Sequence, residues 1–177
     1  MQAERRRTHG ERLRIAVIDL DVHQGNGTAA IFKGDASVFT LSLHGDRNFP
    51  FRKEASDLDV PLPDGCRDGD YLAALDAALD ALWASHAEAA FGLVFFLAGA
   101  DPHENDRLGR LALTAGGLAE RDRRVLAAAR GRGLPVATSM AGGYGKVVED
   151  TVAIQLATLR AACESWQAWR VVEQSGA

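Results

Sequence analysis

The apolar residues of this chain fall into short runs, separated by longer segments in which apolar positions recur with helical spacing. Four short runs, at residues 13–19, 38–43, 92–97 and 135–139, are rich in apolar residues and are bounded by turn-forming residues. Runs of this kind predict buried strands of a parallel sheet. Because they alternate with predicted helices, the sequence favours an α/β fold with three α/β/α layers around a mostly parallel sheet.

The helical segments lie between or after these runs. Four leucines recur with helical spacing within residues 71–90, which predicts an amphipathic helix. Further helices are predicted at residues 114–130 and 149–172. A short helix is expected to be capped by Thr28 and to end at Gly34.

The segment at residues 45–70 contains three prolines and many charged residues, and it is predicted to be a long irregular loop. Phe49 and Phe51 flank Pro50 within it. Exposed apolar side chains of this kind favour a binding role for the loop.

Length and charge limit the protein classes that fit. At 177 residues the chain is expected to form one domain, residues 1–177, with a basic lead segment at residues 1–12. A net charge of −4 argues against nucleic acid as the main partner. No apolar stretch approaches the roughly 20 residues of a membrane span, and no secretory signal is evident, so we expect a cytoplasmic protein without membrane contact. The two cysteines suggest neither a disulfide framework nor a thiolate zinc site.

Acidic side chains and a histidine follow two of the predicted strands. The first strand leads into Asp19, Asp21 and His23, which alternation along an extended strand would project to the same side. Asp101 follows the strand at residues 92–97. Carboxyl ends of adjacent parallel strands meet at one edge of a sheet, so Asp21, His23 and Asp101 are expected to hold one zinc ion. The D-x-H pair alone would favour a simpler interpretation, with turn or capping aspartates and a hydrogen-bonded histidine.

Three protein ligands leave a coordination position open, which is the pattern of a catalytic zinc site. Zinc would polarise a substrate carbonyl and lower the pKa of bound water. Tyr144 lies on a glycine turn after the strand at residues 135–139 and is expected to donate a hydrogen bond to the developing oxyanion. These features together predict amide hydrolysis by metal-activated water.

The sequences D-L-D-V-H-Q-G-N-G-T, S-L-H, G-A-D-x-x-x-x-D-R-L-G and G-G-Y occur in this order. These motifs and their order resemble those of the zinc-dependent histone deacetylase family, which has the arginase/deacetylase fold. The resemblance is greatest to its bacterial and class IV-like members. The resemblance extends from about residue 13 to about residue 159. The two long motifs together are highly specific, and they favour the metal-site interpretation over the turn interpretation.

The resemblance implies a role for each matching residue. It makes Asp21, His23 and Asp101 the zinc ligands and Tyr144 the catalytic hydrogen-bond donor. The remaining family positions fall into two groups. A structural potassium site would use Asp19 and Ser42 with nearby backbone carbonyls, and the substrate channel would be lined by Phe49, Leu108, Gly142 and Gly143.

The resemblance also implies a hydrolase whose substrates are acyl-lysine side chains of proteins or small acylated amines. One departure from the family bears on activity. The family's paired general-base histidines precede the D-x-D-x-H strand, whereas only His9 lies upstream here. A smaller departure is Ala141, at a position where the family commonly has glycine. Alanine is tolerated there if its φ is negative.

Two functions therefore stay open. The first is a zinc-dependent deacylase, or the C-terminal portion of one. The second is a catalytically inactive zinc-binding fragment or partner chain. In either case we expect an N-terminally truncated fold with an exposed sheet edge, covered by a second copy or by a partner chain. An arginase-like two-manganese site would need more bridging aspartates than this chain supplies.

Overall fold

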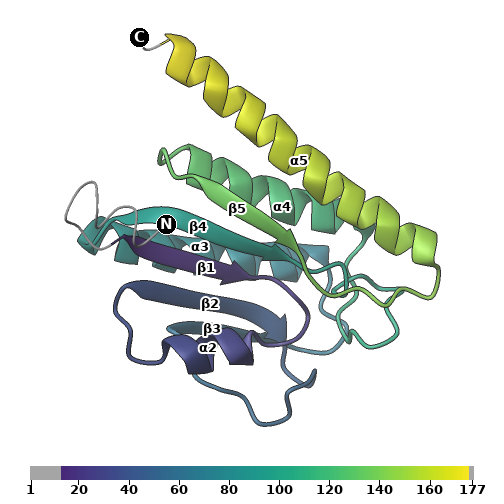
Figure 1. Ribbon diagram of the computed structural model, residues 1–177. Coiled ribbons are helices and arrows are strands. Elements are labelled where there is room, and N and C mark those ends of the chain that lie inside the picture. The colour runs from purple at the N-terminus through teal and green to yellow at the C-terminus, as the bar shows by residue number, and fades with distance from the viewer. Residues whose placement is uncertain (1–12, 176–177) are drawn as a thin grey trace.

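The computed structural model describes residues 13–175, so the predicted basic lead segment lies outside the described residues. The chain forms one sheet of five parallel strands in the order β3-β2-β1-β4-β5, flanked by helices (Figure 1). The elements in chain order are β1 (Arg14–Asp19), α2 (Asn26–Phe32), β2 (Val38–Gly45), β3 (Leu58–Leu62), α3 (Asp68–Glu88), β4 (Phe91–Ala98), α4 (Ala115–Arg130), β5 (Val136–Met140) and α5 (Val148–Ser175). The predicted α/β class is confirmed, and the described sheet is entirely parallel.

Strand β1 lies at the centre of the sheet, paired with β2 on one side and β4 on the other. Its last residue, Asp19, is level with Ser42 of β2 and Leu97 of β4. The register therefore brings the carboxyl ends of the central strands to one edge, and the segments that carry the candidate site residues begin there.

Helices α3 and α4 cover one face of the sheet, and α5 packs against α4 and extends beyond it (Figure 1). The core forms between this face and the helices. Its fully buried side chains include Ile18 and Phe96 from the sheet, Leu75 and Leu82 from α3, and Leu118 from α4. Burying a leucine or isoleucine of this kind contributes about 1.5–3 kcal/mol, so this face supplies much of the driving force for folding.

On the opposite face of the sheet, α2 is the one helix that the described residues provide. A groove of about 410 Å³ remains beside α2, lined by Ile15, Val17, Phe95 and Leu97 among others. Phe95 is 40% exposed although it lies on a central strand. The described part of the chain thus leaves an apolar sheet face partly uncovered.

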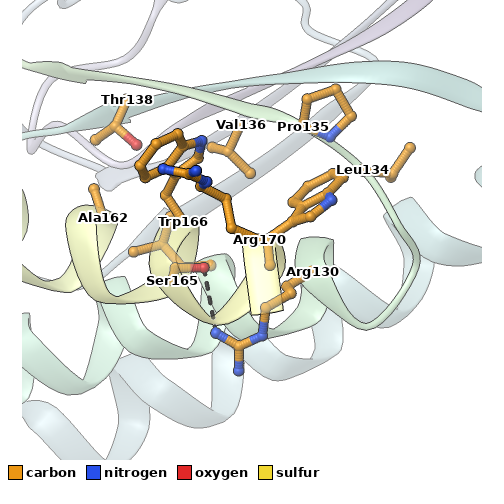
Figure 2. Close-up of a pocket in the computed structure, with 11 residues that line it drawn as sticks. Arg130, Leu134, Pro135, Val136, Thr138, Ala162, Ser165, Trp166 and Arg170 are labelled. Carbon is orange, nitrogen blue, oxygen red and sulfur yellow. Dashed lines mark hydrogen bonds between the residues drawn. The ribbon is translucent and has the colours of Figure 1, made fainter. Parts of the chain in front are cut away.

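A second groove, of about 300 Å³, lies between the end of α4, the amino end of β5 and the second half of α5 (Figure 2). The Arg170 guanidinium lies 4.9 Å from the centre of the Trp166 ring, and Arg130 donates a hydrogen bond of 3.3 Å to Ser165. Pro135 and Val136 line the groove where β5 begins. It therefore lies away from the carboxyl ends of the strands and from the candidate site residues.

Two local predictions were wrong. The segment predicted as an irregular loop contains β3, which pairs with β2 in parallel. Pro61 lies within β3, and proline is tolerated there because β3 is an edge strand. Helix α2 begins at Asn26 rather than after Thr28, and its N-cap is Gly25, which provides no side-chain cap.

The start of α4 agrees with the prediction. Thr114 Oγ1 accepts a hydrogen bond from Gly117 N (3.0 Å) and donates one to Asp68 Oδ2 (2.7 Å) at the start of α3. Thr114 therefore caps one helix and links it to another. None of the described helices is both long enough and apolar enough to cross a membrane.

Replacing Thr114 with alanine removes both hydrogen bonds. We expect Thr114→Ala to lower the free energy of unfolding by about 1–2 kcal/mol, measured by urea denaturation. Thr114→Ser keeps the hydroxyl and should retain most of the stability. Equal losses in the two variants would contradict a capping role for the hydroxyl.

Candidate metal centre

The chain leaves β1 through two successive turns in which an aspartate binds the backbone two residues on. Asp19 Oδ1 accepts a hydrogen bond from Asp21 N (3.1 Å), and Asp21 Oδ1 accepts one from His23 N (2.8 Å). The strand itself ends at Asp19. Asp21 and His23 are therefore positioned by these turns, and the prediction that strand alternation positions them was wrong.

The segments after β4 and β5 are tied to the same turn by backbone amides. Val22 N donates to Asp101 Oδ1 (2.9 Å), which links the turn after β1 to the one after β4. Gly142 N donates to Asp21 Oδ2 (2.7 Å), and Ala100 N donates to Gly142 O (2.7 Å). Three segments far apart in sequence therefore form one hydrogen-bonded unit.

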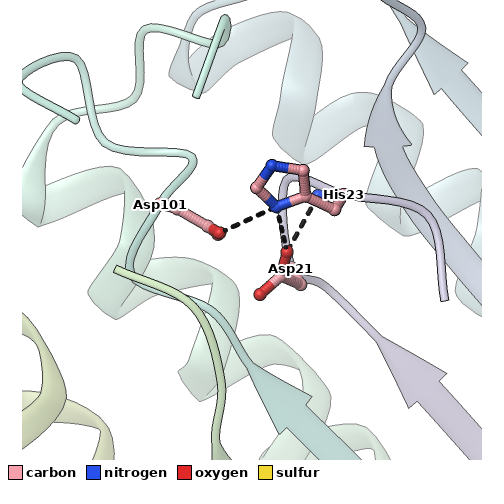
Figure 3. Close-up of side chains that lie close together, drawn as sticks. All are labelled: Asp21, His23 and Asp101. Atoms are coloured by element: carbon pink, nitrogen blue, oxygen red, sulfur yellow. Dashed lines mark hydrogen bonds and ion pairs between the residues drawn. The ribbon is translucent and has the colours of Figure 1, made fainter. Parts of the chain in front are cut away.

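The side chains of Asp21, His23 and Asp101 converge in this unit (Figure 3). His23 Nδ1 lies 2.9 Å from Asp21 Oδ1 and 3.2 Å from Asp101 Oδ2. One ligand atom from each residue lies within 4.8 Å of the others. In the part of the chain that the structure describes, no other three His, Cys, Asp or Glu side chains come together in this way.

The charges in the cluster favour a cation. Burial raises the pKa of Asp101 to about 6. The carboxylates that lie beside Nδ1, first that of Asp101 and then that of Asp21, raise the pKa of His23 to about 10. Burial also acts to raise the pKa of Asp21, but its hydrogen bonds with His23 and from Gly142 hold that pKa below its ordinary value. Two carboxylates thus face one imidazole, whose proton provides positive charge where a metal ion would.

Asp101 provides the most direct evidence that a metal fits. Its Oδ2 is buried and accepts no hydrogen bond from the described residues, because the 3.2 Å contact with His23 Nδ1 lacks hydrogen-bond geometry. Apart from this ion pair with His23, Oδ2 has no donor among the described residues, and a buried carboxylate oxygen without a hydrogen bond is costly. Carboxylate oxygens with an imidazole nitrogen are also a donor set that zinc accepts, so the residues present fit this metal.

Lack of space at the cluster explains Gly99 of the G-A-D motif and Gly142 of the G-G-Y motif. A Cβ added to Gly142 would collide with Asp101 Oδ2 and lie 2.6 Å from Asp21 Oδ2. A Cβ on Gly99 would lie 2.6 Å from Asp101 Oδ1 and 2.7 Å from Asp21 Cα. Ala141 fits as expected, since no described residue other than glycine has positive φ.

Tyr144 follows this turn, and its side chain is 63% exposed. Its backbone N donates to Asp106 Oδ2 (2.6 Å), while Asp106 Oδ1 accepts hydrogen bonds from Leu108 N and Gly109 N (2.8 Å each). Asp106 thus fixes the backbone at Tyr144, a role that sequence reasoning missed although this aspartate is part of the G-A-D-x-x-x-x-D motif. The role of the Tyr144 hydroxyl stays a prediction.

Asp19, the last residue of β1, lies beside Ser42 of β2. Both are buried, and Ser42 Oγ accepts a hydrogen bond of 3.2 Å from Gly25 N. A Cβ on Gly25 would collide with Asp19 Oδ2, so both side chains border Gly25. Burial raises the pKa of Asp19 to about 7. Potassium binding at this pair stays a prediction.

The predicted channel residues Phe49 and Leu108 are both exposed, at 61% and 54%. Their loops are adjacent, because Asn48 Nδ2 donates to Leu108 O (2.8 Å). Asn48 belongs to none of the metal-ligand or catalytic motifs, so nothing in the sequence indicates this link. The role of the two side chains in a channel also stays a prediction.

Comparison with known proteins gives the family. Residues 1–159 match the histone deacetylase domain family. An uncharacterized protein of Picosynechococcus sp. is 48% identical over 139 residues, which cover 78% of this chain and 45% of that protein. Histone deacetylase 2 of Arabidopsis thaliana is 32% identical over 146 residues, covering 78% of this chain and 37% of that protein.

A solved structure shares the fold. An HDAC homologue from Aquifex aeolicus superposes with a TM-score of 0.66 at 28% identity, over 86% of this chain and 41% of that one. The chain therefore spans less than half the length of these relatives. The family match and the Asp21–His23–Asp101 cluster lead to one conclusion: this chain belongs to the histone deacetylase family.

Proposed function

We propose that this chain provides the zinc-binding part of a deacylase active site. The activity would be that of a hydrolase, which removes acyl groups from acyl-lysine in proteins or from small acylated amines. The observation that carries the proposal is the convergence of Asp21, His23 and Asp101, in which a buried oxygen of Asp101 accepts no hydrogen bond and is ion-paired only with His23. A cytoplasmic location, expected from the sequence, is part of the proposal.

The three residues of the cluster share one task, and the residues around them have others. Asp101 Oδ2, a carboxylate oxygen of Asp21 and His23 Nδ1 would hold the metal. When bound there, zinc supplies polarisation of an acyl carbonyl and a lowered pKa for coordinated water. The Gly142 amide keeps Asp21 oriented through its hydrogen bond. The Tyr144 hydroxyl would donate a hydrogen bond to the oxygen on which negative charge develops.

The same proposal includes a potassium ion beside the zinc ligands. Asp19 and Ser42 would contribute side-chain oxygens. The carbonyls of Asp21 and His23 accept no backbone hydrogen bond from the described residues, so they are available as further ligands. A cation there would fix the turn that presents Asp21 and His23.

The substrate would approach between Phe49 and Leu108. Both are exposed apolar side chains on loops joined through Asn48, and an acyl-lysine has a matching apolar stem. Gly142 and Gly143 would line the inner part of the path, where the absence of side chains leaves room.

A catalytically inactive zinc-binding domain is the second candidate, and one observation favours it. Among the histidines of the described residues, only His23 belongs to the cluster. The cluster therefore includes no histidine pair of the kind that accepts a proton from the attacking water in the family. Lack of a general base typically costs about 10²–10⁴-fold in rate.

Zinc content and turnover, measured together, test the proposal. We expect one zinc per chain, with slow hydrolysis of a fluorogenic acyl-lysine peptide. Asp101→Asn should weaken zinc binding by more than about 100-fold, because it removes a charged ligand rather than an outer partner. Asp76→Asn, a change at an exposed aspartate paired with Arg124, should bind zinc normally.

The outcomes separate the two candidates. Zinc together with turnover that Asp101→Asn abolishes supports a deacylase. Zinc without measurable turnover supports the inactive domain. Zinc binding that Asp101→Asn leaves unchanged would overturn the site.

Gly142→Ala tests the crowding at the cluster. The added methyl group has no room beside the carboxylates of Asp21 and Asp101, so they must move apart. We expect zinc affinity to fall by at least about tenfold. Gly69→Ala is the matched control, because a Cβ at this helical position meets nothing within 4 Å. Equal zinc affinities in the two variants would contradict the crowded geometry.

We also propose that a second copy or a partner chain covers the uncovered sheet face beside α2. Light scattering should show association that increases with concentration. Phe95→Glu places a charge on this face and should shift the protein toward monomer. Val152→Glu, at a similarly exposed apolar position on α5, should not. A wild-type protein that stays monomeric at all concentrations would exclude a second copy as the cover and leave only a partner chain.

A further inference from the structure

Arg121 of α4 is completely buried beneath the metal centre. Its Nη1 donates hydrogen bonds to two backbone carbonyls, Leu20 O (3.2 Å) and Gly99 O (2.7 Å). Leu20 immediately precedes Asp21, and Gly99 lies two residues before Asp101. One guanidinium nitrogen therefore joins the two chain segments that supply the ligand cluster.

The orientation of this guanidinium is fixed from the helical layer. Arg121 Nε lies 2.8 Å from Asp122 Oδ1, and Nη2 lies at the same distance from that oxygen. Asp122 Oδ2 in turn accepts a hydrogen bond of 2.5 Å from Thr158 Oγ1 of α5. All three side chains are buried, so α4 and α5 together hold the fork in one direction.

A buried ion pair of this kind is weak evidence for a contribution to stability, because the desolvation of both charges offsets their attraction. The guanidinium instead provides hydrogen-bond donors in a fixed arrangement. Its planar fork binds Asp122 and still presents a nitrogen to two carbonyls, which the single point charge of a lysine cannot reproduce. Within the described residues no hydrogen bond joins Arg121 to Asp21 or Asp101, and its direct contacts with the two segments are with their backbone carbonyls.

We propose that Arg121 is a positioning residue of the metal centre. By holding the Leu20 and Gly99 carbonyls together, it sets the spacing between Asp21 and Asp101. Asp122 and Thr158 fix Arg121 in turn. This inference rests on the proposed zinc site, and it extends the functional unit from the strand ends into α4 and α5.

Zinc affinity and the visible spectrum of the Co²⁺-substituted protein test this role, because the spectrum reports coordination geometry independently of activity. We expect Arg121→Met to weaken zinc binding about 10–100-fold, the range for outer-sphere partners, and to alter the Co²⁺ spectrum. Arg121→Lys, which can still donate to one carbonyl, should recover part of that affinity. If Arg121→Met fails to fold, Thr158→Val, which keeps Arg121 but frees Asp122, should show a smaller loss and a smaller spectral change.

Leu126→Ala is the matched control, since it removes buried apolar volume from the same helix without touching the network. It should shift the urea midpoint but keep the wild-type zinc affinity and Co²⁺ spectrum. If the Arg121 and Thr158 variants bind zinc like Leu126→Ala, with the wild-type spectrum, the positioning role is overturned while the zinc site stands. If the wild-type protein binds no zinc, the proposed site fails, and the positioning role fails with it.

Discussion

The Asp21–His23–Asp101 cluster depends on backbone amides that hold the two aspartates from different segments. Asp101 is held by the amide of Val22, and Asp21 is held by the amides of His23 and Gly142. Each of these bonds except the one from His23 joins segments far apart in sequence, so no carboxylate is positioned by its own strand alone. One oxygen of Asp101 accepts the Val22 amide, and the other is ion-paired with His23, at the position proposed for the metal.

The parallel sheet brings the segments that carry these residues to the same place. Level registers between β1, β2 and β4 bring their carboxyl ends to one edge, and the buried face against α3 and α4 keeps those ends fixed. Burial in this structure also changes the pKa values of the clustered side chains. It raises the pKa of Asp101, while the carboxylates raise that of His23, so the site balances its own negative charge with a proton in place of a metal. The glycines at positions 99 and 142 are the steric condition for bringing the backbones so close.

Much of this could be predicted from the sequence, because strands and ligands follow simple local patterns. The apolar runs ending in Asp19 and before Asp101 indicate where two neighbouring strands end, and the motifs contain Asp21, His23 and Asp101, which the structure brings together. Strand β3 was missed because Pro61 resembles a loop residue unless its edge position is known. Arg121 was missed for a different reason. A charged residue in an amphipathic helix suggests the surface, and its partner carbonyls lie 101 and 22 residues away in sequence.

X-ray absorption at the zinc edge tests the central claim most directly, because it identifies the atoms that bind the metal. For the zinc-loaded protein we predict an oxygen and nitrogen shell at about 2.0–2.2 Å, with the signature of a single imidazole and no sulfur. A sulfur contribution at about 2.3 Å would show zinc on Cys66 or Cys163 instead. A shell with no imidazole would exclude His23. Either result would contradict a metal centre built from Asp21, His23 and Asp101.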